Sequence, residues 1–284
     1  MAAKAMSYSV LTITHGRGDR LANLIAGANQ SSLVPAEIVV VFMSQRDEPK
    51  LESTVPVRRV HVEGEPLPLA AARNLAATSA STNTLIFLDV DCIPARDLAR
   101  VLIGSIATNG GIVMATPRYL REPPTIPLCF DDLHLGSVEH PGRSKLAVGP
   151  VADYNAFWSL CFGMTGDDFS KVGGFDTDYA GYGAEDTDFA RRAQRASVPL
   201  HLASGVAYHQ FHQTHRPPLN HFEDIVRNAK VFFRKWQAWP MEGWLRQFNA
   251  GGYIAWDTGA SDIMVLRRPT DLEIAASRSD DAFG

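Results

Sequence analysis

The stretch LIFLDVD, residues 85–91, decides how the rest of the chain is interpreted. Its first four residues, Leu85–Leu88, are all apolar, and such a run predicts a strand that is buried on both faces of a mainly parallel sheet. Two carboxylates, Asp89 and Asp91, follow at the end of this strand and leave the sheet together. Hard oxygen ligands of this kind suit Mg²⁺ or Mn²⁺ that bridges a diphosphate. A solvated strand end is the plain alternative, because Asp-x-Asp is common by itself.

Strand-like and helix-like patterns alternate on both sides of this stretch. The expected strands are Tyr8–Ile13, Glu37–Met43, Val57–Val62 and Ile112–Thr116, and the expected helices are Arg20–Gln30, Leu69–Ser79 and Ala95–Thr108. This alternation predicts βαβ units, and therefore an α/β fold with a doubly wound, mainly parallel sheet and helices on both faces. Ligands of such sheets bind at the carboxyl ends of the strands, where Thr14, Ser44, Asp89 and Asp91 lie.

The pattern changes after residue 116. Pro117–Pro150 is rich in Pro, Gly, His and charge, and we expect a long irregular region that is functional or mobile. Glu185–Ala196 and Leu219–Trp239 have helical patterns, and Pro199–Tyr208 is strand-like. We expect residues 1–216 to form the main domain, and residues 217–284 to form a helical and irregular extension that packs on it.

Composition limits the classes of function. The chain has 284 residues, 45% of them apolar, which suits one large α/β domain or two small ones. The net charge of −4 provides no basic field, so nucleic acid is not an expected partner.

Three cysteines without a C-x-x-C pair argue against a disulfide framework and favour a cytoplasmic location. Met1–Ser9 lacks the apolar core of a signal peptide, and no run approaches the roughly 20 apolar residues of a transmembrane segment. Peripheral contact with a membrane-bound acceptor stays open.

A second acidic cluster lies in GYGAEDTDF, residues 181–189. Three acids gather at the start of a predicted helix, where one or two of them would simply complement the helix dipole. The dipole does not explain the glycines, which let a backbone come close to a ligand. A carboxylate on such a rigid helix start can act as general base towards an acceptor hydroxyl.

Three histidines follow the strand that ends near Tyr208, in the segment HQFHQTH, residues 209–215. His209 is nearest the strand end, and we expect it to complete the metal site. A separate three-histidine zinc site is an alternative, although histidines at every third residue before Pro217 suit no regular zinc helix. The simplest alternative is that residues 209–215 form a histidine-rich surface loop that binds no metal.

Two further candidate binding residues, Arg73 and Trp158, have weaker support from the sequence. Arg73, on an alanine-rich helix, could extend to solvent or reach a diphosphate. Phe157, Trp158 and Phe162 are more typical of a core than of a sugar platform, and Trp158 is the candidate for stacking on an acceptor sugar.

The order of these pieces resembles the family 2 glycosyltransferases of GT-A fold, with a galactosyltransferase-like C-terminal signature. The resemblance rests on four stretches: Ser9–Arg17, Pro68–Ala76, Leu85–Pro94 and Phe162–Arg191. The last contains Gly-Gly-Phe-Asp and Gly-x-Gly-x-Glu-Asp, whose combination is far more specific than Asp-x-Asp alone.

The resemblance implies an inverting sugar transfer from a nucleotide sugar to an acceptor hydroxyl, with Mn²⁺ or Mg²⁺ as cofactor. A UDP-sugar is the expected donor, although Met43–Asp47 departs from the family pattern at the base and leaves uridine or another base open. The acceptor could be a glycan, a lipid-linked sugar, a protein or a small molecule. The implied roles are donor binding by Thr14, Arg17, Arg73, Asn74 and Asp89, metal binding by Asp91 and His209, base catalysis by Asp186, and acceptor contact by Glu185. Trp158 and Tyr182, as nearby aromatic residues, are further candidates for acceptor contact.

Three other functions compete with this one. A haloacid-dehalogenase-type phosphatase would use Asp89 as nucleophile, but that family places its motif after the first strand. A nucleotide-sugar sensor would bind the donor without transferring it. A nucleotidyltransferase usually has a lysine in the loop after its first strand, and residues 14–18 have none.

Overall fold

The computed structural model describes residues 7–281. Within this range ten strands form one sheet in the order β3-β2-β1-β4-β9-β6-β10-β5, with β7 paired to β6 and β8 paired to β10. The stretch Met1–Ser9, in which we expected no signal peptide, lies mostly outside the described residues. The sheet strands are β1 Tyr8–Thr14, β2 Glu37–Met43, β3 Val57–Val62, β4 Thr84–Leu88, β5 Cys92–Pro94, β6 Ile112–Leu120, β7 Ser137–Glu139, β8 Gly149–Pro150, β9 Cys161–Thr165 and β10 Leu200–His209.

The long strands run mainly in one direction. β1, β2, β3 and β4 pair in parallel, and so do β6 and β10. Only β9 interrupts this series of long strands within the described chain, because it is antiparallel to both β4 and β6. The predicted α/β fold with a mainly parallel sheet is therefore confirmed.

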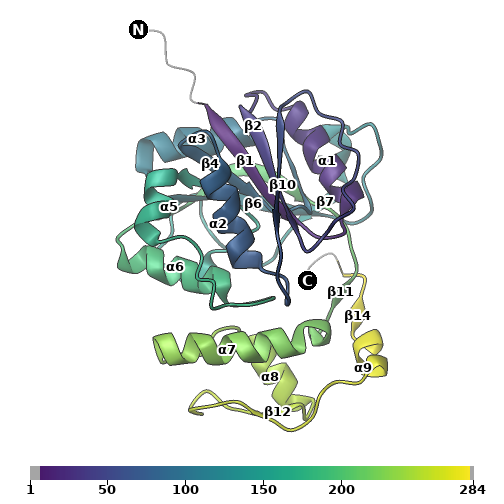
Figure 1. Ribbon diagram of the computed structural model, residues 1–284, viewed down its shortest axis with the longest axis vertical. Coiled ribbons are helices and arrows are strands. Elements are labelled where there is room, and N and C mark those ends of the chain that lie inside the picture. The colour runs from purple at the N-terminus through teal and green to yellow at the C-terminus, as the bar shows by residue number, and fades with distance from the viewer. Residues whose placement is uncertain (1–6, 282–284) are drawn as a thin grey trace.

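Helices cover both faces of this sheet, as Figure 1 shows. α1 (Gly18–Asn29) and α3 (Leu98–Asn109) pack on one face, and α2 (Leu69–Ser79), α5 (Gly166–Val172) and α6 (Glu185–Arg195) pack on the other. All seven residues of β2 are buried, as expected for a strand covered on both sides.

The region 117–150 is more regular than we predicted. β6 continues to Leu120, and α4 (Phe130–Leu135), β7 and β8 follow. Arg118 stabilises this part, because its Nε donates to Ser137 Oγ at 2.9 Å and its Nη1 contacts Glu139 at 3.1 Å. These contacts come from partners about 20 residues away, so local patterns did not reveal them.

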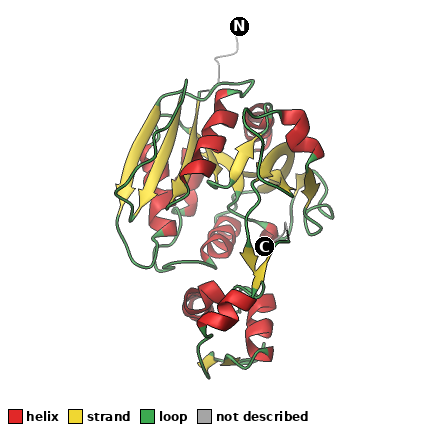
Figure 2. Ribbon diagram, turned by 90° about the vertical axis from the view of Figure 1, so that its right-hand side faces the viewer, coloured by secondary structure: helices red, strands yellow, loops and turns green. Residues whose placement is uncertain are grey.

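The C-terminal elements form a second group below the sheet in Figures 1 and 2. They are η2 (Leu219–His221), α7 (Phe222–Trp236), α8 (Glu242–Ala250) and α9 (Asp271–Ala276), with the short pairs β11 (Thr214–His215) with β14 (Arg278–Ser279) and β12 (Ile254–Ala255) with β13 (Met264–Val265). The group has its own apolar cluster, whose buried members run from Leu219 to Ile263. This cluster supports a division of the chain at residue 216, which we keep as a proposal.

Asp188 on α6 joins the two groups. Its buried carboxylate accepts from Trp236 Nε1 at 2.8 Å and pairs with Lys235 at 2.6 Å, both on α7. Arg192 and the Tyr179 hydroxyl contact the same carboxylate at 2.7 and 3.2 Å. The third acid of the GYGAEDTDF stretch is therefore structural.

The glycines of that stretch also serve packing. Gly181 has a φ of +72°, and a Cβ there would collide with the Asp224 carboxylate of α7. Gly183 has a φ of +103° and lies against Met241. We expected these glycines to admit a ligand, whereas the structure shows that they admit the C-terminal group.

We predict that Asp188→Ala lowers the free energy of unfolding by about 3–5 kcal/mol, because it leaves buried cationic and N–H groups without their acceptor. Urea denaturation measures this change. Glu223→Ala on α7 is the matched control, since Glu223 pairs with Arg268 on the surface with 55% of its side chain exposed, and it should change stability by less than about 1 kcal/mol. Equal effects of the two substitutions would refute a structural role for Asp188.

Candidate active site

The carboxyl ends of β1, β4 and β10 bring the predicted residues together at one edge of the sheet. Thr14 is the last residue of β1, Asp89 and Asp91 lie in the turn between β4 and β5, and His209 ends β10. β5 pairs with β10 so that Cys92 lies opposite His209. This pairing places Asp91 beside the end of β10, although the two segments are far apart in sequence.

Asp91 is buried, with only 3% of its side chain exposed, and two arginines bind it. Arg17 Nη1 contacts Oδ2, and Arg20 Nη1 contacts Oδ1 at 2.7 Å. Arg17 precedes α1 and Arg20 lies in its first turn. Both arginines therefore reach the strand end from the start of one helix.

Asp91, His209 and His212 form a cluster that can hold a metal ion. One ligand atom from each lies within 4.8 Å of the others. Burial lowers the pKa of His209 to about 4, so its imidazole is neutral at pH 7 and can bind a cation. Among the described residues, no other group of this kind occurs. His215 lies elsewhere, with Nδ1 at 2.9 Å from Ser277 Oγ, so the alternative of a three-histidine zinc site is not supported.

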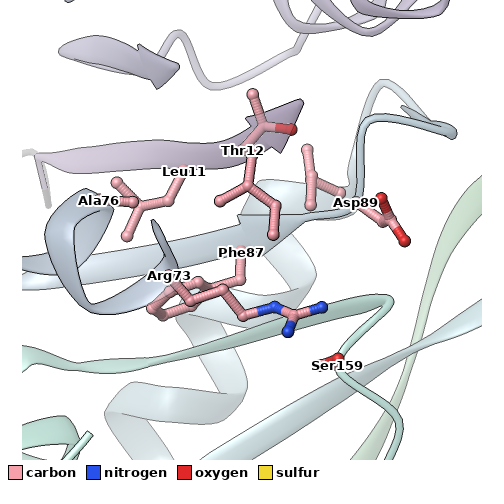
Figure 3. Close-up of a pocket in the computed structure, with 9 residues that line it drawn as sticks. Leu11, Thr12, Arg73, Ala76, Phe87, Asp89 and Ser159 are labelled. Carbon is pink, nitrogen blue, oxygen red and sulfur yellow. The ribbon is translucent and has the colours of Figure 1, made fainter. Parts of the chain in front are cut away.

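Asp89, Arg73 and Ser159 all line one small pocket, which Figure 3 shows. Burial and the neighbouring charge of Asp91 raise the pKa of the Asp89 carboxyl, whereas Arg17 and Arg73 lower it. The hydroxyl of Thr12, which also lines the pocket, has no hydrogen-bond partner among the described residues. The pocket therefore offers both donor and acceptor groups to a ligand.

Arg73 connects the two acidic clusters. Its Nη1 donates to Glu185 Oε1 at 3.0 Å, and Glu185 Oε2 accepts from the Gly183 amide at 3.1 Å. Asn74, the next residue, is directed away from this contact. Its amide donates to the Phe175 carbonyl at 2.8 Å and accepts from the Phe175 amide at 2.7 Å. We expected Asn74 to line the donor pocket, but both ends of its side chain hold the Gly-Gly-Phe-Asp turn instead.

Asp186 differs from its two acidic neighbours because no arginine or lysine of the described chain pairs with it. Its Oδ1 accepts from the Thr187 amide at 2.7 Å. Burial, and then the charge of Glu185, raise its pKa to about 6. A carboxylate with a pKa this close to neutrality is suited to accept a proton.

Tyr182 stands beside these carboxylates. Its hydroxyl group is the enclosed part of the side chain: burial there raises the pKa of the phenol, and the charges of Glu185, Asp186 and Asp89 raise it further. Its ring stacks on His221 with centroids 4.4 Å apart and faces Trp244 of α8 at 5.9 Å. With 38% of its surface exposed, Tyr182 forms an aromatic surface shared by the sheet and the C-terminal group.

Trp158 has a different environment from the one we predicted. The Arg143 guanidinium lies 3.9 Å from the centroid of its ring, and His140 meets the ring edge at 4.8 Å. One ring face is therefore covered by a cation. Phe157 and Phe162 are buried in the core, which confirms their expected role.

The loops after β1 and β2 contact each other at the edge expected to meet a nucleotide. His15 Nδ1 lies 2.7 Å from the Met43 carbonyl, and the Gly16 amide donates to Gln45 Oε1 at 2.7 Å. Thr14 is buried, and its hydroxyl has no partner within the described range.

Four residues of this site were not singled out from the sequence: Arg20, Arg143, His221 and Trp244. His212 was considered only as part of the alternative three-histidine zinc site. Arg20 lies three residues after Arg17, a spacing that brings both to one side of a helix start, and this signal could have been used. Arg143, His221 and Trp244 reach the site through contacts between distant segments.

The fold and the acidic strand edge define a glycosyltransferase of GT-A fold. A profile of glycosyl transferase family 2 matches residues 9–130, and a profile of the N-terminal domain of galactosyltransferase matches residues 139–216. The two matches together support a glycosyltransferase of family 2. No curated protein sequence matches it.

Solved structures share the fold at low identity. GalNAc-T7, crystallised with UDP, GalNAc and Mn²⁺, has a TM-score of 0.55 and 16% identity over 72% of this chain and 44% of its own. S. aureus TarS 1–349 has a TM-score of 0.52 and 14% identity over 80% of this chain and 66% of its own. This chain therefore spans less than two thirds of either relative. The family match and the position of β4, which follows three strands, argue against the phosphatase and nucleotidyltransferase alternatives.

We predict that Mn²⁺ binding depends on His212 as well as on Asp91 and His209. Calorimetric titration should show no binding to Asp91→Ala, and affinity lowered by more than about tenfold for His209→Ala and His212→Ala. His201→Ala, near the opposite end of β10, is the control and should bind as the wild type does. Unchanged affinity in His212→Ala would remove this residue from the metal site.

Proposed function

We propose that this chain transfers a sugar from a nucleotide sugar, with UDP as the nucleotide, to an acceptor hydroxyl with inversion. One observation carries the proposal: the charges of Asp186, whose pKa is raised, and of Asp89, which lies in the same turn as the metal-ligand candidate Asp91, both act on the Tyr182 phenol. A base near a leaving-group site suits direct displacement.

The metal-ligand cluster suits a divalent cation. A carboxylate oxygen with two imidazole nitrogens departs from the oxygen ligands that Mg²⁺ prefers, and we propose Mn²⁺, the cation in the GalNAc-T7 crystals. When bound, the cation would offset negative charge on the diphosphate. Arg17 and Arg20, which hold the Asp91 carboxylate in place, add positive charge at the same point.

Asp186 would take the proton of the acceptor hydroxyl. Its pKa of about 6 keeps it ionised at pH 7, and Glu185 beside it is fixed by Arg73. Glu185 can therefore accept a hydrogen bond from a second acceptor hydroxyl without moving. Tyr182 provides an adjacent aromatic surface for a sugar ring.

The donor would lie between Thr14, Arg17, Asp89 and Arg73. The Thr14 hydroxyl, which has no partner among residues 7–281, and the half-exposed Arg17 can meet the nucleotide, and Asp89 can accept hydrogen bonds from a ribose or sugar hydroxyl. The crystals of GalNAc-T7 and of TarS with UDP support uridine as the base.

The aromatic rings of Tyr182 and Trp244 bear on the class of acceptor. They offer a surface on which the sugar ring of a glycan, a lipid-linked sugar or another hydroxyl compound can lie. No helix among residues 7–281 is long and apolar enough to cross a bilayer. We propose a cytoplasmic location, in keeping with three unpaired cysteines, and peripheral contact if the acceptor is membrane-bound.

We predict that Asp186→Asn lowers the rate of transfer by about 10²–10⁴-fold, because the amide cannot accept the proton. UDP binding, measured by calorimetry with Mn²⁺, should not change. Asp178→Asn, an exposed acid in the preceding turn, is the control. Normal transfer by Asp186→Asn would exclude it as the base. UDP-sugar binding without transfer in the wild type would favour the sensor alternative.

The pH profile tests the same assignment. Because burial raises the Asp186 pKa, the carboxyl is protonated and inactive below pH of about 6 and ionised above it. The logarithm of kcat/KM should therefore rise with pH by about one unit per pH unit up to this value and then level off. His209, with a pKa of about 4, does not titrate in this range. A flat profile between pH 5 and 7 would contradict the prediction.

A further inference from the structure

Arg143 is a buried arginine that the proposed mechanism does not use. It lies in the loop between β7 and β8, and only 5% of its surface is exposed. Backbone hydrogen bonds hold the loop around it, since the Arg143 amide donates to the His140 carbonyl at 2.8 Å and the Leu146 amide donates to the Arg143 carbonyl at 2.9 Å. The guanidinium therefore has a defined position over the Trp158 ring.

The charge of this guanidinium has no counterion within the described chain. No carboxylate of residues 7–281 forms an ion pair with it, and Nε has no hydrogen-bond partner there. The hydrogen bond made by Nη1 goes to the Met114 thioether at 3.5 Å, which is a weak acceptor. Burial of a cation without an anion is unfavourable, and it lowers the pKa of Arg143 to about 10. Such a group needs a partner that the protein itself does not supply.

Arg143 lies next to the candidate active site. A series of rings joins it to the metal-ligand cluster: Trp158 contacts His140 at 4.8 Å, His140 contacts Tyr119 at 5.6 Å, and Tyr119 contacts His209 at 4.7 Å. The charge of Asp186 is also near enough to act on the guanidinium. Arg143 is therefore close to the residue proposed for the acceptor proton, and one series of ring contacts links it to the proposed metal ligand His209.

We propose that Arg143 binds an anionic oxygen group of the substrate, either a phosphate of the donor or a carboxylate on the transferred sugar. This inference rests on the proposed function and adds a binding residue to it. Arginine offers planar paired donors that match the oxygens of both groups. Trp158 fixes the plane of the guanidinium by cation–π contact, so its position is set before the substrate arrives.

The first test is the stability of the free protein. Arg143→Met replaces an unpaired buried cation with an apolar chain of similar length beside Met114. If the cation is reserved for a ligand, the Tm of this variant is equal to or higher than that of the wild type. Arg143→Lys keeps the charge and loses the planar donors, and it serves as the second variant if Arg143→Met does not fold.

The second test measures binding of four probes in the presence of Mn²⁺: pyrophosphate, UDP, UDP-glucose and UDP-glucuronate. Titrations follow heat and tryptophan fluorescence in the wild type, Arg143→Met and Arg143→Lys, with exposed Arg100→Met as control. A loss of at least about tenfold for all four probes assigns Arg143 to a phosphate. A loss confined to UDP-glucuronate assigns it to a sugar carboxylate. Trp158→Phe should abolish the Arg143-dependent part of the fluorescence change.

The outcomes separate this inference from the proposed function. If the wild type binds the nucleotides and the Arg143 variants bind them equally well, the inference is wrong and the transferase proposal stands. If the wild type binds pyrophosphate through Arg143 but binds no nucleotide, the anion site stands and the proposed function fails. If none of the four anions binds to the wild type, the inference is overturned.

Discussion

The carboxylate of Asp91 lies where almost none of its surface reaches water, and two separate segments contact it. The start of α1 supplies Arg17 and Arg20, which compensate its charge, and the loop after β10 places the His212 imidazole 3.7 Å away. Gln210 locks this arrangement, since its amide donates to the Asp91 carbonyl at 2.7 Å and its side chain donates to the Arg20 carbonyl at 3.0 Å. A buried carboxylate needs such partners. The position of Asp91 therefore fixes how α1, β4 and β10 are placed relative to one another.

Glu185, Asp186 and Asp188 show how neighbouring acids on one helix acquire different roles. Asp188 faces α7 and is neutralised by several donors. Glu185 faces Arg73 and is held as a fixed acceptor. Asp186 has no cationic partner among the described residues, and its pKa rises accordingly. All three residues are carboxylic acids in the first turn of α6, so their type and position in the sequence do not distinguish them. The direction of each side chain therefore determines which acid can take part in proton transfer.

The same reasoning explains what the sequence could and could not predict. β2 and α2 have the predicted bounds, because a continuous apolar run and an alanine-rich segment are strong local signals. The strand edge with Asp91 and His209 was predicted from chain order alone, since parallel strands end on one side of a sheet. Region 117–150 and the elements after residue 240 were not predicted, because distant partners stabilise them. Arg143 was missed for a related reason: a lone arginine in a polar loop gives no sign that it is buried.

The pairing of β11 with β14 has a consequence for the order in which the protein is made. β11 directly follows the loop that carries His212, and its partner Arg278–Ser279 is synthesised more than 60 residues later. At a translation rate of about 5–20 residues per second, the sheet has several seconds in which to form before this loop gains its last strand partner. The pairing with β14 is therefore a contact that the segment after His212 gains only after every strand of the main sheet has been synthesised.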